Sequence, residues 1–254
     1  ALGTCRYKIQ FKKDPEQAAR DMGRLFDVFK AHNIRYFFYA GGNDSQDTNN
    51  KLHHEAVKRS FPMRCIGVPK TIDNDLPHTD HTPGYGSAAK YNATTVMEVA
   101  QDVASMATDD GSCCMIEVMG RAAGWLAAGT VLAKRKQTDG PHIILMPEIP
   151  LYEEAFLTKV KEIVDQHGNS IVVDGEGIKD MDGNELGADK TRLDSFGHPV
   201  LSGAAEALGE IVHGKLDLKT RTVKLGYAQR AAAHFASQQD VDEAVACGLS
   251  LIHI

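Results

Sequence analysis

The segment from Pro69 to Asp75 places several reactive side chains within a few residues of one another. Lys70 stands three residues before Asp73, and a second carboxylate, Asp75, follows two positions later. A carboxylate can take a proton from a hydroxyl group, and a lysine ammonium can neutralise charge on a transferred group. The arrangement suits metal-assisted proton abstraction. The alternative interpretation is a simple polar turn, because Asp and Asn form turns easily.

An apolar run places this segment at the end of a strand. Residues Met63 to Val68 predict a buried strand, which stops at Pro69 because proline cannot extend a central ladder. In an open α/β sheet, ligands bind beyond the carboxyl ends of the strands. We therefore expect the segment after Pro69 to lie at a binding edge.

The preceding strand is predicted to end in a second loop, one that suits an anion. Residues 34–40 form an aromatic-rich apolar run, followed by Gly41-Gly42-Asn43-Asp44-Ser45. Two glycines allow a sharp turn and a close approach to a ligand. Ser45 is predicted to cap the next helix, whose N-terminus favours a phosphate group.

A third predicted strand, at residues 112–118, also leads into a charged loop. It continues through Met119 and Gly120 to Arg121, where a helix over residues 121–136 is predicted to begin. The planar guanidinium of an arginine at such a corner can grip a phosphate or a carboxylate. The alternative for Arg121 is a surface salt bridge.

A fourth predicted strand, at residues 171–173, presents a further carboxylate. Asp174 follows the strand directly, and Glu176 lies between two glycines just beyond it. A carboxylate held at the sheet edge suits a sugar hydroxyl. The basic stretch at residues 221–230 predicts one more strand and loop, with ordinary protein surface as the alternative.

The order of the predicted elements indicates the fold class. Further helices are predicted to begin at Asp14, after Ser87, at Pro199 and at Asp240, with another strand at residues 142–146. Strands and helices alternate without an internal repeat or a linker, and this order is typical of α/β architecture.

Composition limits the classes of function. The 254 residues are 24% charged and 43% apolar, which is ordinary for a globular protein of one large or two modest domains. A net charge of −6 argues against a general nucleic-acid surface. No apolar run reaches the ~20 residues of a membrane span, and no signal peptide opens the sequence.

Cysteine and histidine spacing gives no metal or disulfide framework. The five cysteines include no CxxC pair, so buried thiols in a reducing cytoplasm are expected. His78 and His81 have the spacing of a ligand pair, but no set of Cys or His partners completes it. The sequence therefore does not predict a zinc site.

Taken together, these loops resemble the phosphofructokinase family, and Lys70 before the Thr-Ile-Asp-Asn-Asp loop resembles its pyrophosphate-dependent branch. The resemblance runs from about residue 2 to residue 248. Its motifs are Gly41–Ser45, Thr71–Asp75, Pro83–Tyr91, Glu117–Arg121, Asp174–Ile178 and Leu225–Arg230. It implies an α/β fold of two Rossmann-like three-layer lobes around a cleft.

The resemblance also implies how the chain divides. Residues 1–84 and 229–248 would form the donor-binding lobe, and residues 85–228 the lobe for fructose 6-phosphate. The family's first strand and Gly-rich loop do not occur before Gly41, so the first lobe is expected to lack its N-terminal part and the chain alone to be inactive. Residues 249–254 depart from the family and are expected to be a non-native tail.

The implied reaction moves a phosphoryl group from pyrophosphate to O1 of D-fructose 6-phosphate, giving fructose 1,6-bisphosphate. Asp73 would be the base, and Lys70 would neutralise charge on the transferred group. Arg221 would reach the neighbouring subunit's site in a homodimer or homotetramer. The other residues implied to bind the sugar phosphate are Thr71, Ile72, Asp75, Met119, Gly120, Arg121, Glu176, Tyr227 and Arg230.

The donor would be bound by Gly42, Asn43, Asp44 and Lys70, with Mg²⁺ as the cofactor at Asn43. Asp44 and Lys70 stand where ATP-dependent relatives carry glycine. Asp44 is grouped with the catalytic residues because its charge would repel the α-phosphate of a nucleotide. Asn43 replaces an Asp expected to help organise Mg²⁺, and a neutral amide would hold the metal less strongly.

The sequence departs from the family at three other positions, and two other functions stay open. Ala122 replaces a usual His, Ser112 a phosphate-binding Arg, and Asp174 a commoner Val or Ser. The alternatives are an ATP-dependent member of the family and a sugar-phosphate-binding protein without catalysis. The second is disfavoured because Lys70, Asp73 and Asp75 are all present. A cytoplasmic protein without nucleic-acid or membrane partners is expected.

Overall fold

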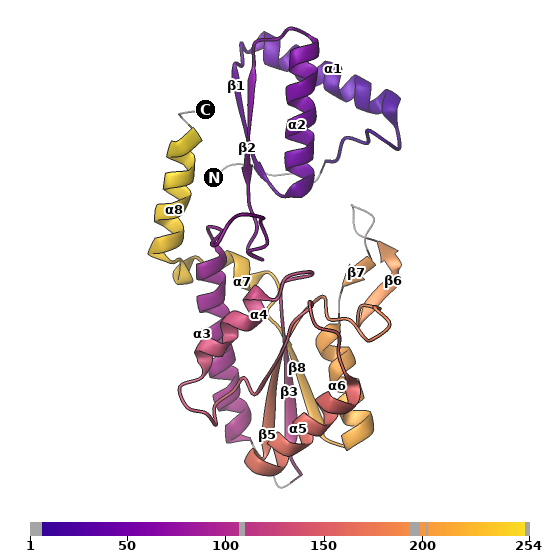
Figure 1. The fold of residues 1–254 in the computed structure, drawn as a ribbon, viewed down its shortest axis with the longest axis vertical. Coiled ribbons are helices and arrows are strands. Elements are labelled where there is room, and N and C mark those ends of the chain that lie inside the picture. The colour runs from indigo at the N-terminus through magenta and orange to yellow at the C-terminus, as the bar shows by residue number, and fades with distance from the viewer. Residues whose placement is uncertain (1–6, 107–109, 194–198, 202, 252–254) are drawn as a thin grey trace. The chain divides into compact units, whose positions relative to one another are not determined.

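The computed structural model describes residues 7–106, 110–193, 199–201 and 203–251 (Figure 1). Its contacts divide the chain into two compact units, one of Ala1–Lys70 with Val245–Ile254 and one of Thr71–Ala244. The lobe boundaries near residues 84 and 229 stay a prediction. In the described residues, no helix has the length and apolar character needed to cross a membrane.

The first unit is a parallel strand pair packed with helices. Strands β1 (Tyr36–Gly41) and β2 (Arg64–Pro69) run in register, with Gly41 opposite Pro69. Helices α1 (Pro15–Ala31) and α2 (Asn43–Lys58) contribute the buried residues Phe26, Phe29, Leu52 and Ala56 to one core cluster. The predicted start of α1 is confirmed, since the Asp14 side chain accepts a hydrogen bond from the Gln17 amide at 2.9 Å.

The second unit is built on a parallel sheet in the order β4-β5-β3-β8. The strands are β3 (Ser112–Val118), β4 (Ile143–Leu145), β5 (Asn169–Gly175) and β8 (Lys219–Lys224). The helices are α3 (Tyr85–Ser105), α4 (Trp125–Gly129), η1 (Thr130–Ala133), α5 (Glu153–His167), α6 (Ala204–Leu216), α7 (Ala228–Ala231), η2 (Ala233–Phe235) and α8 (Gln238–Ser250), the last continuing into the first unit. A short antiparallel pair, β6 (Ala188–Leu193) with β7 (Pro199–Leu201), lies apart from the sheet.

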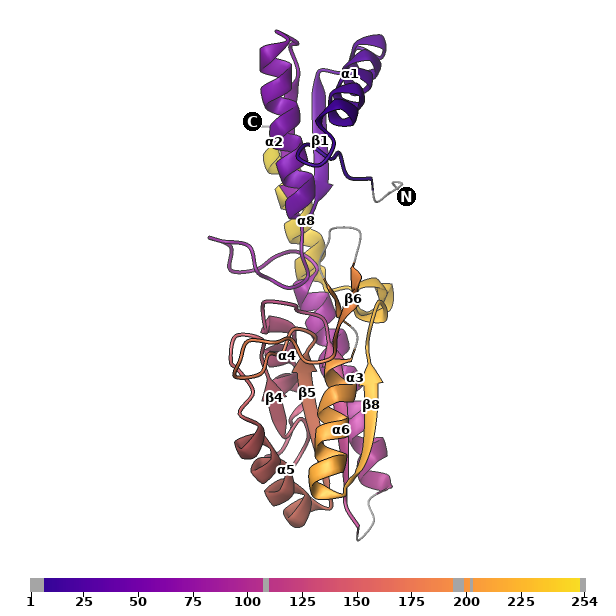
Figure 2. The ribbon, with the colours of Figure 1, turned by 90° about the vertical axis from the view of Figure 1, so that its right-hand side faces the viewer.

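Helices pack against both faces of this sheet (Figure 2), and alternating side chains give it two apolar faces. Cys114 and Ile116 of β3 pack with α3 and α4, whereas Cys113 and Met115 of the same strand pack with α5 and α6. Because successive residues of a strand point to opposite faces, a strand buried on both sides is largely apolar, and in β3 only Ser112 and Glu117 are polar. The result is a three-layer α/β/α unit, and the predicted α/β class is confirmed.

Five predicted helix starts are wrong. Helix α3 begins at Tyr85 rather than after Ser87, and α8 begins at Gln238 rather than at Asp240. The other three errors each involve a glycine. The helix predicted over residues 121–136 begins only at Trp125, since Gly120 has a φ of +123° and the chain turns before α4. Pro199 lies in β7, and α6 begins at Ala204, after Gly203 with a φ of +138°. Ser45 does not cap α2, because Gly42 occupies the N-cap position. The backbone carbonyl of Gly42 accepts a hydrogen bond from the Ser45 backbone amide at 2.9 Å.

Candidate active site

The loop that carries Asp73 is closed by one buried side chain, Asn74. The side-chain nitrogen Nδ2 of Asn74 donates to the Asp80 backbone carbonyl at 3.0 Å, and its Oδ1 accepts from the Thr82 backbone amide at 2.7 Å. Asn74 itself has a φ of +56°, a left-handed conformation that Asn tolerates better than most residues. It thereby fixes the start of the loop, where the Asp73 amide donates to the Thr71 hydroxyl at 3.0 Å. The sequence motif contained Asn74, but we did not assign it this role.

Glu176 lies close enough to Asp73 for the two carboxylates to influence each other. Burial raises the pKa of Glu176, and the charges of Asp73 and Glu117 raise that pKa further. The Gly120 amide and the Arg121 guanidinium oppose this rise in pKa. Asp73, Glu176 and Arg121, which the sequence places on three separate loops, therefore share one electrostatic environment.

Glycines allow the loops after β3 and β5 to touch. A Cβ on Gly177 would lie 1.7 Å from the Arg121 carbonyl oxygen, and one on Gly175 would lie 3.3 Å from the Gly120 carbonyl oxygen. The Glu176 amide between them donates to the Val118 carbonyl at 3.0 Å. The two glycines around Glu176 therefore hold its backbone against the segment that carries Arg121.

We expect Gly177→Ala to destabilise the chain by about 1–3 kcal/mol or more, because its methyl group would overlap backbone that cannot move aside cheaply. Urea unfolding followed by circular dichroism measures the change. Gly214→Ala is the matched control, since a Cβ there meets nothing within 4 Å and alanine favours α6. Equal unfolding midpoints for Gly177→Ala and the wild-type chain would show that the two loops do not touch as described.

Arg121 has the half-buried position expected of a ligand-binding arginine. Its Nε lies 3.9 Å from Glu185 Oε1, so an ion pair is formed within the chain, although a long one. Glu185 forms an isolated antiparallel β-bridge with Lys179, across the turn between them. The salt-bridge alternative and the ligand-binding role are thus compatible, since a phosphate can compete with so long a contact.

Gln229 is a positioning residue that sequence reasoning missed. Its buried side-chain oxygen accepts from the Met119 amide at 3.2 Å and from Asn92 Nδ2 at 3.1 Å. Its amide nitrogen donates to the Gly226 carbonyl at 3.0 Å. Gln229 therefore ties the ends of β3 and β8 to α3. A glutamine between an expected ligand pair, Tyr227 and Arg230, gave no local signal of this role.

The structure does not bring every expected sugar-phosphate residue to the same place. Tyr227 is 69% exposed, and the guanidinium carbon of Arg230 lies 4.4 Å from the centroid of the Tyr227 ring. Arg221 lies opposite Cys114, midway along the edge strand β8, and its guanidinium donates to Met106 Sδ at 3.9 Å. Within this chain Arg221 is not part of the Asp73 group. Ile72 packs on the apolar core and Asp75 is exposed.

A row of ionisable side chains lies beneath the group formed by Asp73, Glu176 and Arg121. Register aligns Asp174, Glu117 and Lys224 on three neighbouring strands. Asp174 is fully buried, neither of its oxygens has a hydrogen-bond partner in the described part of the chain, and burial raises its pKa well above the usual range. The neutral acid is thus favoured at Asp174. Lys224 Nζ lies 2.8 Å from Glu206 and 4.0 Å from Glu117.

The residues expected to bind the donor lie together in the first unit. The Lys70 amide donates to the Gly41 carbonyl at 3.1 Å, and a Cβ on Gly42 would lie 3.8 Å from Lys70 Nζ. Asn43 and Asp44 are exposed in the first turn of α2, where the helix dipole favours an anion. Asp44 also forms an ion pair with Lys8 at 3.1 Å, which the sequence did not predict.

These first-turn residues fit a weakly held metal ion. Mg²⁺ usually keeps several waters and takes only one or two protein oxygens together with substrate phosphates. The exposed amide of Asn43 and carboxylate of Asp44 supply such oxygens. Lys8 offsets part of the negative charge of Asp44. A metal ion would therefore depend on the oxygens of the phosphoryl donor for much of its binding.

The whole sequence is similar to that of known proteins. The phosphofructokinase family model matches residues 1–253. A pyrophosphate–fructose 6-phosphate 1-phosphotransferase of Halomonas elongata is 44% identical over 254 residues, all of this chain and 60% of that protein. A protein of the same name from Xanthomonas campestris is 45% identical over 252 residues, 99% of this chain and 60% of that protein. The chain thus spans about 60% of the length of these relatives.

Solved structures give a matching fold. The crystal structure of a pyrophosphate-dependent phosphofructokinase from Marinobacter aquaeolei superposes with a TM-score of 0.79 at 41% identity, covering all of this chain and 58% of that one. A phosphofructokinase from Pichia pastoris, 21% identical, superposes with a TM-score of 0.64 over 96% of this chain and 25% of that one. The second likeness shows the fold alone.

Proposed function

The chain belongs to the phosphofructokinase family, and from this premise we propose that the complete protein transfers a phosphoryl group from pyrophosphate to O1 of D-fructose 6-phosphate. The products are fructose 1,6-bisphosphate and orthophosphate. The observation that carries the proposal is that Gly175 and Gly177 hold the loop of Glu176 against the backbone of Gly120 and Arg121, where the charge of Asp73 also acts on Glu176. Relatives that span more than this chain and are 44–45% identical to it bear a matching name.

Asp73 takes the proton from the O1 hydroxyl as that oxygen attacks the phosphorus. Glu176 accepts hydrogen bonds from the sugar hydroxyls, and the backbone at Met119 and Gly120 lines the same position. Because phosphoryl transfer needs little covalent chemistry from the protein, most of the barrier lowering comes from positioning and electrostatics. The glycine contacts and the Gln229 hydrogen bonds support this positioning.

The phosphate groups require cations. Arg121, Tyr227 and Arg230 hold the 6-phosphate, and Lys70 neutralises charge on the group in transfer. Gly42 allows the donor to approach the backbone at the start of α2, with Asn43 and Asp44 beside it. Mg²⁺, bound through Asn43 and donor oxygens, would screen the charge of the pyrophosphate.

The proposal includes a cytoplasmic location and assembly into a homodimer or homotetramer. The buried thiols support the location: burial raises the pKa of Cys113 to about 12 and that of Cys114 to about 11, so neither is reactive. The position of Arg221 supports the assembly, since in this chain its guanidinium is directed to Met106 and away from the Asp73 group.

The reaction is tested by incubating a full-length relative with fructose 6-phosphate, pyrophosphate and Mg²⁺. Fructose 1,6-bisphosphate and orthophosphate should form in equal amounts, and omission of any one component should stop the reaction. Glucose 6-phosphate, which lacks the primary hydroxyl at this position, should not replace the acceptor. Absence of bisphosphate with every phosphoryl donor would contradict the proposal.

Shared sites predict complementation between inactive subunits. A full-length protein with Arg221→Ala and one with Asp73→Asn should each be nearly inactive. When mixed oligomers form, some sites receive an intact Arg221 from one subunit and an intact Asp73 from the other, so part of the activity should return. Native mass spectrometry verifies the mixing. Verified hetero-oligomers without activity would contradict a role for Arg221 across the subunit boundary.

A further inference from the structure

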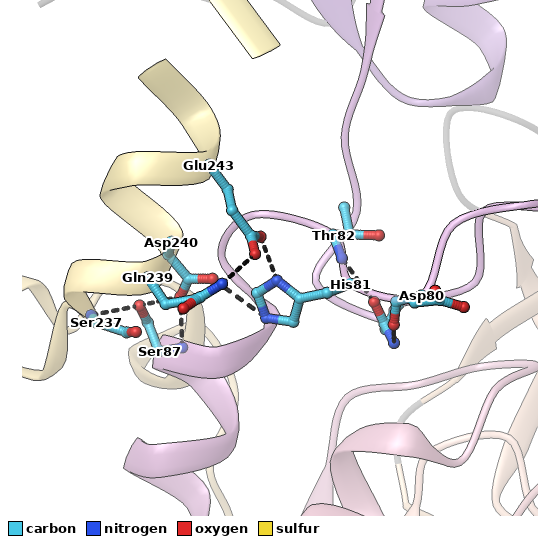
Figure 3. A network of polar contacts seen from close by, with 9 residues as sticks. Asp80, His81, Thr82, Ser87, Ser237, Gln239, Asp240 and Glu243 are labelled. Carbon is cyan, nitrogen blue, oxygen red and sulfur yellow. Dashed lines mark hydrogen bonds and ion pairs between the residues drawn. The ribbon is translucent and has the colours of Figure 1, made fainter. Parts of the chain in front are cut away.

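A cluster of three potential metal ligands lies in the second unit, away from the residues assigned above. His81 belongs to the loop that begins at Asp73, and Asp240 and Glu243 belong to the first turns of α8 (Figure 3). Each of the three offers one ligand atom, and these atoms all lie within 4.8 Å of one another. The histidine ring lies between the two carboxylates, with Nδ1 against Glu243 and Nε2 3.5 Å from Asp240 Oδ1.

Asp240 shows why an ion pair alone does not account for the cluster. Its side chain is only 7% exposed, and its Oδ2 accepts from both the amide and the hydroxyl of Ser87. Its Oδ1, directed at His81, has no hydrogen-bond partner among the residues that the structure describes. A buried carboxylate oxygen without a hydrogen-bond partner is unfavourable, and a bound cation would satisfy it.

The surroundings of the cluster are those of a prepared site. The Ser87 hydroxyl that holds Asp240 in turn accepts from the Ser237 amide at 2.8 Å, so the carboxylate is oriented from behind. A Cβ on Gly86 would lie 3.2 Å from His81 Nε2 and 3.5 Å from both Asp240 oxygens. Glycine at this position therefore keeps the space between the ring nitrogen and the carboxylate open.

The charge state also suits a cation. Burial opposes ionisation of Asp240, but the hydrogen bonds from Ser87 and the Gly84 amide outweigh it and lower the pKa of Asp240. The hydrogen bonds from Gln239 and His81 lower the pKa of Glu243. Both groups are thus carboxylates at neutral pH, and two negative charges face one imidazole.

We propose that His81, Asp240 and Glu243 form a binding site for a divalent transition-metal ion of the Zn²⁺ type. Two ligands of a tetrahedral ion with bonds of ~2.1 Å lie about 3.4 Å apart, close to the 3.5 Å between His81 Nε2 and Asp240 Oδ1. His81 and Glu243 are 28% and 30% exposed and can close on the ion, while Asp240 stays fixed. Waters complete the shell.

The choice of ion follows from the ligand types. Imidazole favours Zn²⁺ and similar first-row ions, whereas Mg²⁺ and Ca²⁺ prefer oxygen ligands alone. A bound ion would cross-link the loop that carries Asp73 to α8. Its role is therefore structural, and it is separate from the magnesium expected at the first turn of α2.

The test is a titration of Zn²⁺ into the 254-residue chain, without an affinity tag and after removal of metal with a chelator. Isothermal titration should show one site that is at least tenfold weaker in both His81→Asn and Glu243→Gln. The matched controls are His78→Asn, an exposed histidine of the same loop, and Asp242→Asn, an exposed carboxylate of the same helix; both should bind as the wild type does. Zn²⁺ binding by histidines that are unchanged in the wild type and the four variants adds the same background to all five titrations.

A second readout follows the cross-link itself. Zn²⁺ should raise the melting temperature of the wild type and of both controls, and this rise should shrink in the two site variants. Circular dichroism verifies that each variant is folded, and Glu243→Gln is expected to fold because its side chain is partly exposed. The proposal is overturned if the wild type binds no Zn²⁺, if both site variants bind it unchanged, or if only one of them loses the site.

Discussion

Replacing Asp73 with Asn should lower kcat about 10²–10⁴-fold while the KM for fructose 6-phosphate changes little. Asparagine keeps the shape of the side chain and the backbone bond to the Thr71 hydroxyl, which uses the amide of residue 73. It cannot accept the O1 proton. The loss therefore falls on the chemical step rather than on sugar binding. Steady-state rates of a full-length relative, with the change made at the matching position, measure this effect.

The control for this variant is His78→Asn on the same loop. His78 is exposed and has a φ of +60°, a conformation that Asn adopts readily, so the loop should keep its structure and its activity. An Asp73→Asn enzyme that retains more than about a third of the wild-type kcat would exclude Asp73 as the general base.

Replacing Asp44 with Gly should admit ATP as a donor. Like charges ~4 Å apart repel by about 4 kcal/mol at an effective dielectric constant near 20, which corresponds to roughly three decades in affinity. The ion pair with Lys8 and the exposure of Asp44 reduce that repulsion, so we expect kcat/KM for ATP to rise about 10- to 100-fold.

Lys70→Gly separates the two parts of donor selection. The lysine should help a small donor that has no nucleoside contacts, so its loss should depress turnover with pyrophosphate, both alone and combined with Asp44→Gly. Lys8→Ala is a useful companion, because it removes the positive charge that offsets the charge of Asp44 and should make ATP a still poorer donor. If Asp44→Gly leaves the rate with ATP unchanged, Asp44 does not exclude the nucleotide.

The sequence was sufficient to predict the parallel strands, but not the antiparallel pair β6 and β7. Apolar runs bounded by Pro62 and Pro69, and by Gly111 and Gly120, are local signals, and β2 and β3 lie where these signals placed them. The charged residues after each strand could then be assigned to one edge of an α/β sheet. This is why Arg121 and Glu176 could each be placed at the end of a strand from the sequence alone.

What the sequence could not predict depends on partners far along the chain. Gln229 bonds to residues 110 and 137 positions away, and Asp240 bonds to Ser87 across 153 positions. The metal cluster escaped notice for the same reason, since His81 finds carboxylates on α8 rather than a Cys or His partner nearby. Glycine conformations caused the errors at 121–124 and 199–203, because a left-handed φ is not visible in composition.

Initial rates of an unmutated full-length relative show which phosphoryl donor the enzyme uses. With saturating fructose 6-phosphate and Mg²⁺, kcat/KM should be at least about 100-fold higher for pyrophosphate than for ATP, as expected if charge and space at residue 44 exclude the nucleotide. Equal use of the two donors, or a preference for ATP, would contradict pyrophosphate as the preferred donor.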